Sequence, residues 1–459
     1  MIVCRSEKIL APATKEKLSI FCQVELKHVI SVHDVSNIYH VPLILLDQGV
    51  HGILKSLLNL GHMPAEPSFA AWKHIADTVD NFTAKVEIAI VGKYNGLSDS
   101  YLSVLKSLMH SGIHLNTEVA VKWIEAAHLE EATRVSDPEL HASAWQSLRQ
   151  VAGVVVPGGF GNRGVEGKIL AAQYCRESRT PYLGVCLGMQ VMVIEYARHV
   201  LHLADANSTE FNDQSTHPAV VFMPEINPDI MGGTMRLGSR PTTVAALSPS
   251  GSATLASRVY GTTVANAQVH ERHRHRYEVN PELVPALEAK GLLFSGKDET
   301  GVRMEIAELP TDVHPFFIGA QFHPEFKSRP NRPSPLFFAL VAVACGRGSE
   351  LEKAGVIWQR DLSVDQQAQS KEATTPTSAR EPPLDGSPTP YRKRSASQIS
   401  VTSSRSMESP ARGLKLPEVS ETDDSRIPKT VLSPMVPGRM NSIAGWTDLP
   451  PAKAAAGSK

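Results

Sequence analysis

The stretch Pro181-Tyr-Leu-Gly-Val-Cys-Leu-Gly-Met-Gln190 decides the fold class of this chain. An apolar, strand-like run leads into Cys186, and Gly184 and Gly188 lie two residues to either side of it. The apolar spacing that follows predicts a helix. A sharp strand-to-helix turn presents a nucleophile, and small neighbours leave room for the turn and for substrate. We therefore interpret Cys186 as a nucleophile whose thiolate is favoured by a helix N-terminus; a buried, inert cysteine is the alternative.

A second apolar run ends in a base and a carboxylate. Residues 316–322 are apolar enough to form a buried strand, and His323 and Glu325 follow directly. In such a pair the carboxylate orients and charges the imidazole, which in turn activates the cysteine. On its own the pair is better explained as a capping histidine and a solvated glutamate at a strand end. Together with Cys186 it predicts a Cys-His-Glu triad.

A glycine-rich turn completes the predicted chemistry. Val154-Val-Val-Pro-Gly-Gly-Phe-Gly161 is an apolar strand that breaks into glycines. Acyl transfer needs backbone N–H donors aimed at the developing oxyanion, and the amides of Gly159 and Leu187 are the expected donors. A phosphate-binding loop is the alternative, but the sequence contains no G-x-x-x-x-G-K-[ST] motif.

Strand and helix patterns alternate with short connections through the middle of the chain. This alternation predicts an α/β fold, a mostly parallel sheet with helices on both faces, with catalytic groups at the carboxyl ends of its strands. The expected elements are a strand over 86–92, a helix after Ser98 or Asp99, a strand near 119–124, a helix opened by Asp137-Pro138, a strand over 151–156, a helix over 164–178 and a strand over 182–185.

These motifs carry a family resemblance. Val156-Pro-Gly-Gly-Phe-Gly161, Gly184-Val-Cys-Leu-Gly-Met-Gln190 and Gln321-Phe-His-Pro-Glu-Phe326 resemble the three signatures of class I glutamine amidotransferases. Three further segments are similar to the CTP synthase family: Ala206-Asn-Ser-Thr-Glu-Phe211, Met231-Gly-Gly-Thr-Met-Arg-Leu-Gly238 and Glu271-Arg-His-Arg-His-Arg-Tyr-Glu-Val-Asn280. The resemblance implies a class I glutamine amidotransferase-like fold.

The resemblance also implies a set of glutamine contacts beside the triad. Glu210 is expected to bind the substrate's α-amino group, and Arg276 its α-carboxylate through the planar guanidinium fork. The remaining implied contacts are Gly159, Leu187, Gly188, Met189 and Gln190. Without the resemblance, residues 272–276 form a solvated basic loop. Its two histidines lack a carboxylate or cysteine cluster, so we expect no metal site.

The N-terminal residues resemble the last part of the family's ATP-dependent synthetase domain. Lys17 matches a position near bound UTP or CTP, and Asp34-Val35 lies near the family's adenine site. The family's phosphate-binding loop and magnesium carboxylates do not occur in this sequence, so we expect an N-terminally truncated chain. The predicted domains are a synthetase remnant (1–49), a linker (50–85), an amidotransferase domain (86–346) and a disordered tail (347–459).

The expected function is that of the glutaminase half of CTP synthase, a ligase of pyrimidine nucleotide biosynthesis that aminates UTP with ammonia from glutamine. The family uses ATP and Mg, has no covalent cofactor, and takes GTP as an allosteric activator. The expected assembly is a homo-tetramer or filament with full-length subunits. Two alternatives stay open: a non-catalytic regulatory subunit of such an assembly, and another thiol hydrolase of the superfamily, such as a peptidase.

The composition limits which binding partners and which cellular compartment we expect for this protein. With 459 residues, 42% of them hydrophobic, and a net charge of −1, the chain offers no global field for nucleic acid or an anionic membrane. Five irregularly spaced cysteines fit a reducing cytosol, so we expect a cytoplasmic protein. The longest apolar run, Leu336 to Cys345, is shorter than the ~20 residues of a membrane span. Beyond residue 346, Ser, Thr, Pro, Lys and Arg dominate, which predicts disorder.

Overall fold

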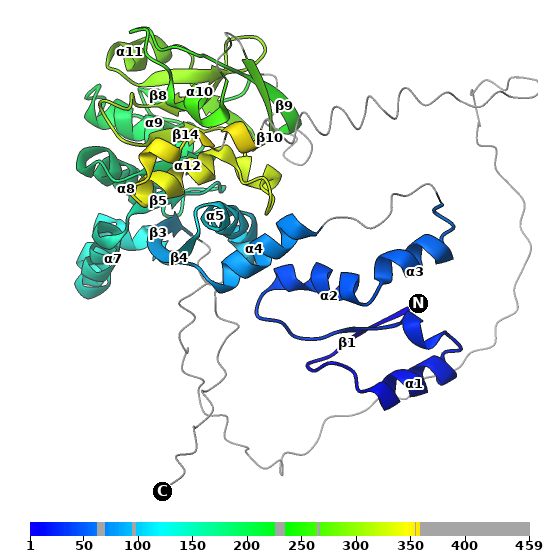
Figure 1. The fold of residues 1–459 in the computed structure, drawn as a ribbon. Coiled ribbons are helices and arrows are strands. Elements are labelled where there is room, and N and C mark those ends of the chain that lie inside the picture. Colours follow the sequence, from blue (N-terminus) through cyan, green and yellow to red (C-terminus); the bar gives the residue numbers. More distant parts are fainter. Residues whose placement is uncertain are drawn as a thin grey trace, which may run out of the picture. The chain divides into compact units, whose positions relative to one another are not determined.

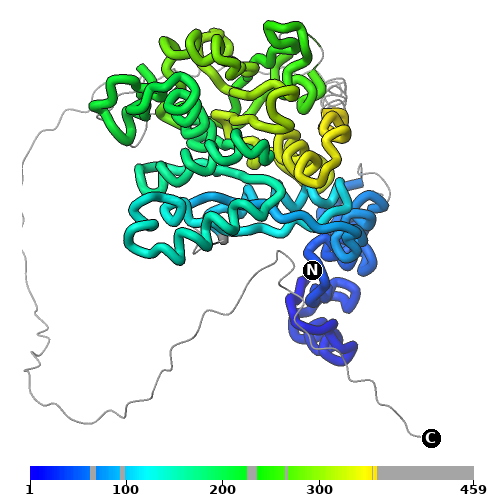
Figure 2. Tube along the Cα trace, turned by 90° about the vertical axis from the view of Figure 1, so that its left-hand side faces the viewer, coloured from blue at the N-terminus to red at the C-terminus, as the bar shows by residue number. Residues whose placement is uncertain are grey.

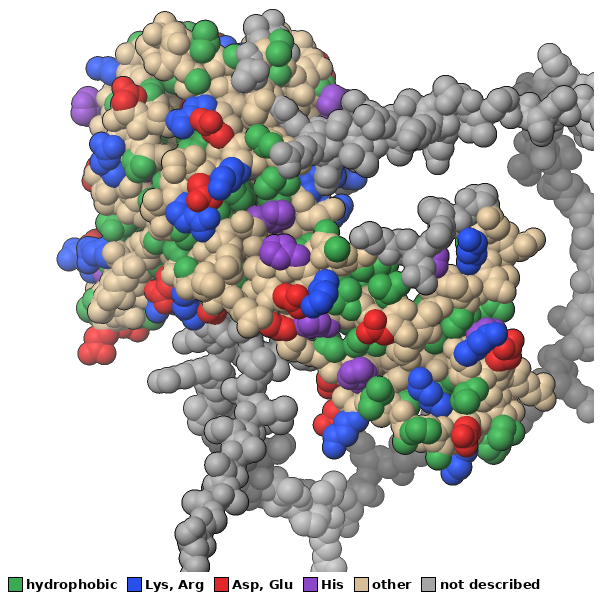
Figure 3. Space-filling model, in the orientation of Figure 1, with side chains coloured by type: hydrophobic (Ala, Val, Ile, Leu, Met, Phe, Trp, Pro, Cys, Tyr) green, Lys and Arg blue, Asp and Glu red, His purple; other side chains and the backbone are tan. Residues whose placement is uncertain are grey.

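The computed structural model describes residues 1–61, 69–93, 98–224, 235–262, 264, 267–353 and 355–358. Most of the predicted disordered tail, from residue 359 onward, lies outside the described residues, as does the part of the 231–238 motif before residue 235. Across the described ranges, no helix combines the length and apolar character needed to cross a membrane. Acidic and basic side chains are interspersed on the face that Figure 3 shows, in keeping with the net charge of −1.

The largest sheet in the described part of the chain has nine strands in the order β10-β9-β12-β13-β14-β6-β5-β3-β4 (Figure 1). One half of it is parallel and follows the predicted strands closely. Its strands are β3 (Ala84–Gly92), β4 (Thr117–Glu125), β5 (Gly153–Val156), β6 (Tyr182–Val185) and β14 (Phe317–Ala320). Ala320 is paired with Val185, so β14 and β6 end at the same level.

The other half of this sheet is antiparallel, which the alternation of helices and strands did not predict. It consists of β9 (Arg236–Val244), β10 (Ala267–His275), β12 (Leu293–Lys297) and β13 (Met304–Glu308). A separate three-stranded sheet contains β7 (Asn207–Ser208), β8 (Pro218–Phe222) and β11 (Tyr277–Val279). Antiparallel neighbours need only short turns and no crossover helix, so this region lacks the strand-helix rhythm on which the sequence prediction depended.

Helices cover both faces of the sheet because successive strand residues point to opposite sides. Ala89 and Val91 pack in one buried cluster, whereas Ile88 and Ile90 pack in another. The first cluster includes residues of α7 (Pro138–Gln150), α8 (Val165–Ser178) and α9 (Leu187–His199). The second includes residues of α5 (Leu102–His114), α10 (Leu255–Tyr260) and α12 (Pro335–Ala344). Figure 2 shows α12, in yellow, beside the strands.

Shorter elements connect these helices and strands. Helix α7 begins as predicted, because the Asp137 carboxylate caps it by accepting the Leu140 N–H at 3.0 Å. The remaining elements of this region are η3 (Ser98–Tyr101), η4 (Ala126–Leu129), α6 (Glu131–Ser136), α11 (Val284–Ala289), η5 (Pro324–Lys327) and η6 (Gly348–Glu350). The predicted α/β fold with helices on both faces of the sheet is therefore confirmed.

The N-terminal residues form a small β-α-β unit. Strands β1 (Ile2–Arg5) and β2 (Val29–Val32) pair in parallel across α1 (Pro12–Phe21), and η1 (Leu26–His28), η2 (Ile38–His40), α2 (Val41–Asp47) and α3 (Val50–Leu57) complete the unit. Val50 and Ile53 of α3 are buried with Ile30. The predicted boundary at residues 49 and 50 therefore does not coincide with a structural boundary. Helix α4 (Ala70–Asp80) buries Ile75 in a cluster with Tyr39 and Ile113.

The packed region also extends beyond the predicted start of the tail at residue 347. Leu351 and Trp358 are each only 3% exposed, and Leu351 belongs to the same buried cluster as α12. Residues 348–353 and 355–358 are thus part of the folded region. The sequence prediction missed this because the few apolar side chains between Gly348 and Trp358 form no regular period.

Replacing Gly188 by Ala should destabilise the fold strongly. A Cβ at Gly188 would lie 2.0 Å from the Val156 carbonyl oxygen, so α9 would have to move away from β5. Overpacking of this kind costs about 1–3 kcal/mol, which calorimetry would record as a lower Tm. The matched control is Gly52→Ala in α3, where a Cβ meets nothing within 4 Å. An equal Tm for the two variants would contradict the close packing inferred at Gly188.

Candidate active site

Cys186 lies at a sharp turn between β6 and α9. Its φ of 53° and ψ of −102° place it in a region that residues with a Cβ rarely adopt. The Cys186 N–H donates to the Ala320 carbonyl at 2.7 Å, and the Cys186 carbonyl accepts the N–H groups of Met189 and Gln190. The turn is therefore held between β14 and the first turn of α9, with the sulfur at the positive end of a helix.

The glycines around Cys186 are required by close backbone approach. A Cβ at Gly184 would lie 2.5 Å from the Gly188 carbonyl oxygen, a distance at which the chain must shift. At Gly158 a Cβ would lie 2.9 Å from His323 Cε1 and 3.4 Å from Cys186 Cβ. The sequence prediction used Gly159 and overlooked Gly158. The sequence showed two adjacent glycines, Gly158 and Gly159, but only the structure shows that the first of them lies against the histidine.

His323 and Glu325 lie where β14 ends and η5 begins. His323 Nδ1 is 2.8 Å from Glu325 Oε1, and both side chains are largely buried. The His323 N–H donates to the Arg272 carbonyl of β10 at 2.7 Å, and Ser107 Oγ of α5 donates to the Glu325 carbonyl at 3.3 Å. The pair is thus fixed from two sides, by the antiparallel half of the sheet and by a helix.

The electrostatics of His323 favour its charged form. Burial alone lowers the pKa of the imidazole, but the charges of Glu325 and Cys186, together with hydrogen bonds to both, raise the pKa to about 10. An imidazolium beside a thiolate is the arrangement that makes a cysteine nucleophilic. At the other buried cysteine, Cys175, burial raises the pKa of the thiol well above its ordinary value.

Two glutamine side chains, Gln321 and Gln190, lie beside the nucleophile, and the sequence prediction named only Gln190. Gln321 Nε2 lies 3.6 Å from Cys186 Sγ, and Gln190 Nε2 donates to Gln321 Oε1 and to the Tyr277 carbonyl, at 3.1 Å each. Gln190 was predicted in the glutamine pocket, whereas Gln321 was not singled out as a site residue. Its position directly after β14 and two residues before His323 was the available signal.

Glu210 and Arg276 lie at the glycine-rich turn. The Gly161 N–H donates to Glu210 Oε1 at 3.1 Å, and the Arg276 guanidinium carbon is 6.0 Å from the centre of the Phe160 ring. Burial raises the pKa of Glu210, and the Gly161 hydrogen bond and nearby cations oppose that shift. One of these cations, Lys168, is fully buried and was not predicted. The turn therefore has a carboxylate and a guanidinium beside it. These two groups are complementary in charge to the α-ammonium and α-carboxylate groups of an amino acid.

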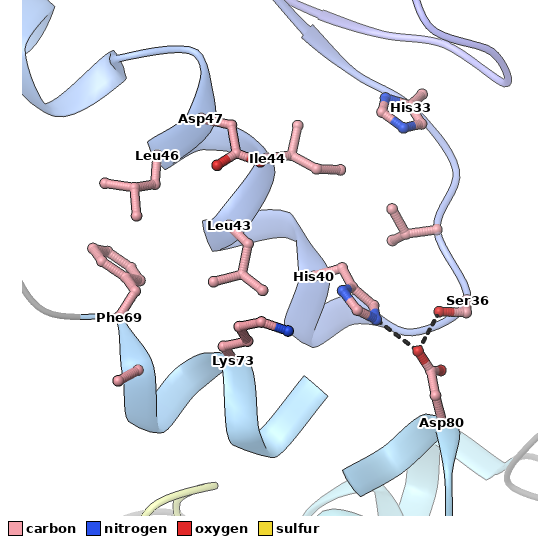
Figure 4. A pocket seen from close by; sticks show the side chains of 12 residues that line it. His33, Ser36, His40, Leu43, Ile44, Leu46, Asp47, Phe69, Lys73 and Asp80 are labelled. Atoms are coloured by element: carbon pink, nitrogen blue, oxygen red, sulfur yellow. Dashed lines mark hydrogen bonds and ion pairs between the residues drawn. The ribbon is translucent and has the colours of Figure 1, made fainter. Parts of the chain in front are cut away.

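Of the two residues expected near a bound nucleotide, Val35 and Lys17, only Val35 lines a cavity described here. Val35 lines an open cavity of about 760 Å³, whose wall also contains His33, Leu43, Phe69 and Lys73 (Figure 4). His40 and Ser36 contact the Asp80 carboxylate at its edge, at 2.7 and 2.9 Å. Lys17 is exposed on α1 and does not line this cavity. In the described part of the chain, no group of three or more His, Cys, Asp or Glu side chains is arranged to hold a metal ion.

The chain belongs to the class I glutamine amidotransferase family. The model of that family, "Glutamine amidotransferase class-I", matches residues 97–343, which is more than half of the chain. Within the family, the expected similarity to CTP synthase is confirmed, and the "CTP synthase N-terminus" model matches residues 1–60. That second match places α3 with the N-terminal unit, in agreement with its packing.

Named relatives give the extent of this similarity. CTP synthase 1-B of Xenopus laevis is 47% identical over 373 residues, covering 81% of this chain and 61% of the relative. CTP synthase 1 of Homo sapiens is 46% identical over 372 residues, with the same coverage of 81% and 61%. The chain thus spans 61% of the length of these relatives. A solved structure of the Trypanosoma brucei CTPS glutaminase domain with bound acivicin is 39% identical, with a TM-score of 0.50, and the match covers 57% of this chain and 94% of that one.

Glu325→Gln should lower the pKa of His323 from about 10 toward or below its ordinary value of 6.5. The reason is that the Glu325 charge is the largest of the effects that raise it. NMR titration of labelled histidine would follow the change. The pKa of His323 is raised in the folded state, so protonation of this imidazole stabilises the fold. This contribution is complete at pH values below the unfolded-state pKa and is lost as pH rises through about 10. The stability difference between wild type and variant should shrink over that range.

The control for this titration is Glu118→Gln, which removes the carboxylate of the exposed ion pair with Lys85 and should leave His323 unchanged. A His323 titration that is the same in Glu325→Gln and wild type would show that Glu325 does not charge the imidazole.

Proposed function

We propose that this chain hydrolyses glutamine to glutamate and ammonia, with Cys186 as nucleophile, His323 as general acid and base, and Glu325 as the group that orients the imidazole. The observation that carries the proposal is the meeting of a strained cysteine turn, at the start of a helix, with a buried His323–Glu325 pair from the neighbouring strand. The raised pKa of His323 supports a resting state in which the imidazole is protonated beside Cys186.

The first half of the reaction forms a thioester. The Cys186 thiolate attacks the side-chain carboxamide carbon of glutamine, and the amides of Gly159 and Leu187 donate to the developing oxyanion. The C–N bond then breaks, and His323 gives its proton to the departing nitrogen, which leaves as ammonia. Water attacks the γ-glutamyl thioester in the second half, with neutral His323 accepting a proton. Glutamate leaves, and the thiolate and imidazolium are restored.

Recognition of glutamine over other amides is assigned to the glycine-rich turn. Glu210 would bind the α-ammonium group of glutamine, and Arg276 would bind its α-carboxylate group. A glutamine residue in the interior of a peptide carries neither of these charges. The pocket wall would be formed by Leu187, Gly188, Met189 and Gln190. The contact of Glu210 with Gly161 supports this assignment, because the carboxylate lies at the same glycine-rich turn as Gly159, one of the two proposed oxyanion donors.

The wider proposal is that the ammonia serves the ATP-dependent amination of UTP to CTP in the cytoplasm. It is supported by the match of residues 1–60 to the CTP synthase N-terminus and by the similarity to CTP synthases over 81% of this chain. UTP, ATP with Mg, GTP as activator, and a homo-tetramer or filament with full-length subunits belong to this proposal. Val35, in the wall of the open cavity, and Lys17 are its nucleotide-contact candidates.

Cys186→Ser should abolish glutamate release by several orders of magnitude while leaving the thermal unfolding curve unchanged, because only the thiolate forms the thioester. A coupled glutamate assay measures the loss. The matched control is Cys22→Ser, which changes an exposed cysteine and should keep full activity. A diazo-ketone analogue of glutamine should label Cys186 in peptide mass spectrometry.

Labelling of Cys175 or Cys345 instead, or glutamate release by the Cys186→Ser variant, would refute the assignment. Hydrolysis of peptides in place of glutamine would indicate a peptidase. If wild type released no glutamate but changed the activity of a full-length CTP synthase, the regulatory-subunit alternative would stand. An increase of glutamate release on adding GTP would support the wider proposal.

A further inference from the structure

Trp358, the last described residue, is buried between two cations. Its side chain is only 3% exposed, with Lys327 Nζ 4.7 Å and the Arg332 guanidinium carbon 5.1 Å from the ring centre. Lys327 is the last residue of η5, the short helix that contains Glu325. A residue far along the chain thus contacts the element that orients the predicted catalytic histidine.

Residues 348–353 and 355–358, here called the C-terminal strap, are held at several points before Trp358. Leu351 is buried in the core cluster of α12, and the Glu352 carboxylate is paired with Arg258 of α10 at 2.9 Å. At Gly355 a Cβ would lie only 2.4 Å from the Gly261 backbone nitrogen. The strap therefore lies close against the end of α10, which limits where the Trp358 ring can be placed.

Lys327 connects the strap to the sheet beneath the site. Its ammonium donates to the His270 carbonyl of β10 and lies near the buried Glu271 carboxylate, to which the Tyr260 hydroxyl donates at 3.1 Å. Burial lowers the pKa of Lys327, and the Glu271 charge opposes this shift. A partly desolvated cation gains more from an aromatic face than an exposed one does. Loss of the ring would therefore loosen Lys327 and the residues next to it.

We propose that Trp358 is a positioning residue for glutamine hydrolysis, which acts by holding Lys327 so that η5 keeps Glu325 in contact with His323 Nδ1. This inference rests on the proposed function. A displacement of about 1 Å in a catalytic group can reduce the rate by about two orders of magnitude, so a looser η5 has a measurable effect. The glutamine contacts proposed for Glu210 and Arg276 do not involve η5, so binding should be spared.

The test uses the full chain with Trp358→Ala, Trp358→Phe and the control Val356→Ala, which truncates a 48% exposed side chain of the same strap. Alkylation of Cys186 by iodoacetamide is followed against pH by peptide mass spectrometry, with the exposed Cys22 as internal standard. Trp358→Ala should react about tenfold more slowly at neutral pH. Trp358→Phe should react within about twofold of wild type, because it keeps an aromatic face. Val356→Ala should match wild type.

Steady-state glutamate release gives the second readout. Trp358→Ala should lower kcat about tenfold with KM unchanged, and Trp358→Phe should restore most of it. A lower affinity for glutamine with kcat unchanged would overturn the inference, as would Cys186 alkylation by Trp358→Ala at the wild-type rate. A third result would separate the two proposals. If Cys186 is alkylated more slowly in Trp358→Ala than in wild type, but wild type releases no glutamate, the proposed function fails and the positioning role of Trp358 stands.

A second variant covers the case in which Trp358→Ala does not fold, as judged by circular dichroism and thermal melting. Lys327→Met keeps the aliphatic stem and removes the charge that contacts both the ring and the His270 carbonyl. It should show the same loss of Cys186 reactivity. Reactivity equal to wild type in Lys327→Met would overturn the inference.

Discussion

The site depends on the close approach of two backbones, at the point where α9 passes over β5. A Cβ at Gly188 would come within 2.0 Å of the Val156 carbonyl oxygen, so only glycine permits this contact. The contact lets α9 begin directly after β6 and holds Cys186 at a φ of 53°. The strain of that conformation is balanced by packing and by the Cys186 N–H bond to Ala320.

The register of the sheet then supplies the base. Because β14 and β6 are parallel neighbours with Ala320 opposite Val185, the residues that follow each strand emerge at one edge of the sheet. Cys186 and His323 meet there although 137 positions separate them in the sequence. The charges gathered at this edge act together: Glu325 and the sulfur outweigh the cost of burial and keep the imidazole protonated.

The antiparallel strands and the C-terminal strap contact the residues at this edge of the sheet. The Arg272 carbonyl of β10 accepts the His323 N–H, and the Arg274 carbonyl lies 3.9 Å from the sulfur. Lys327 joins β10 to Trp358. These supports come from segments without a helix-strand rhythm. Their contribution consists of carbonyl groups and a single ring, which a pattern search along the sequence does not detect.

The sequence by itself determined the parallel strands, the helices around them, the cysteine turn and the His-Glu pair, because local spacing of glycine and apolar residues specifies each of these. Only the tertiary structure decided that Gly158 lies against His323, that Gln321 contacts the sulfur, that α3 packs with the N-terminal unit and that folding continues to Trp358. Each of these depends on contacts between segments far apart in the chain. Sequence periodicity reports which face of an element is buried, not which distant group it meets.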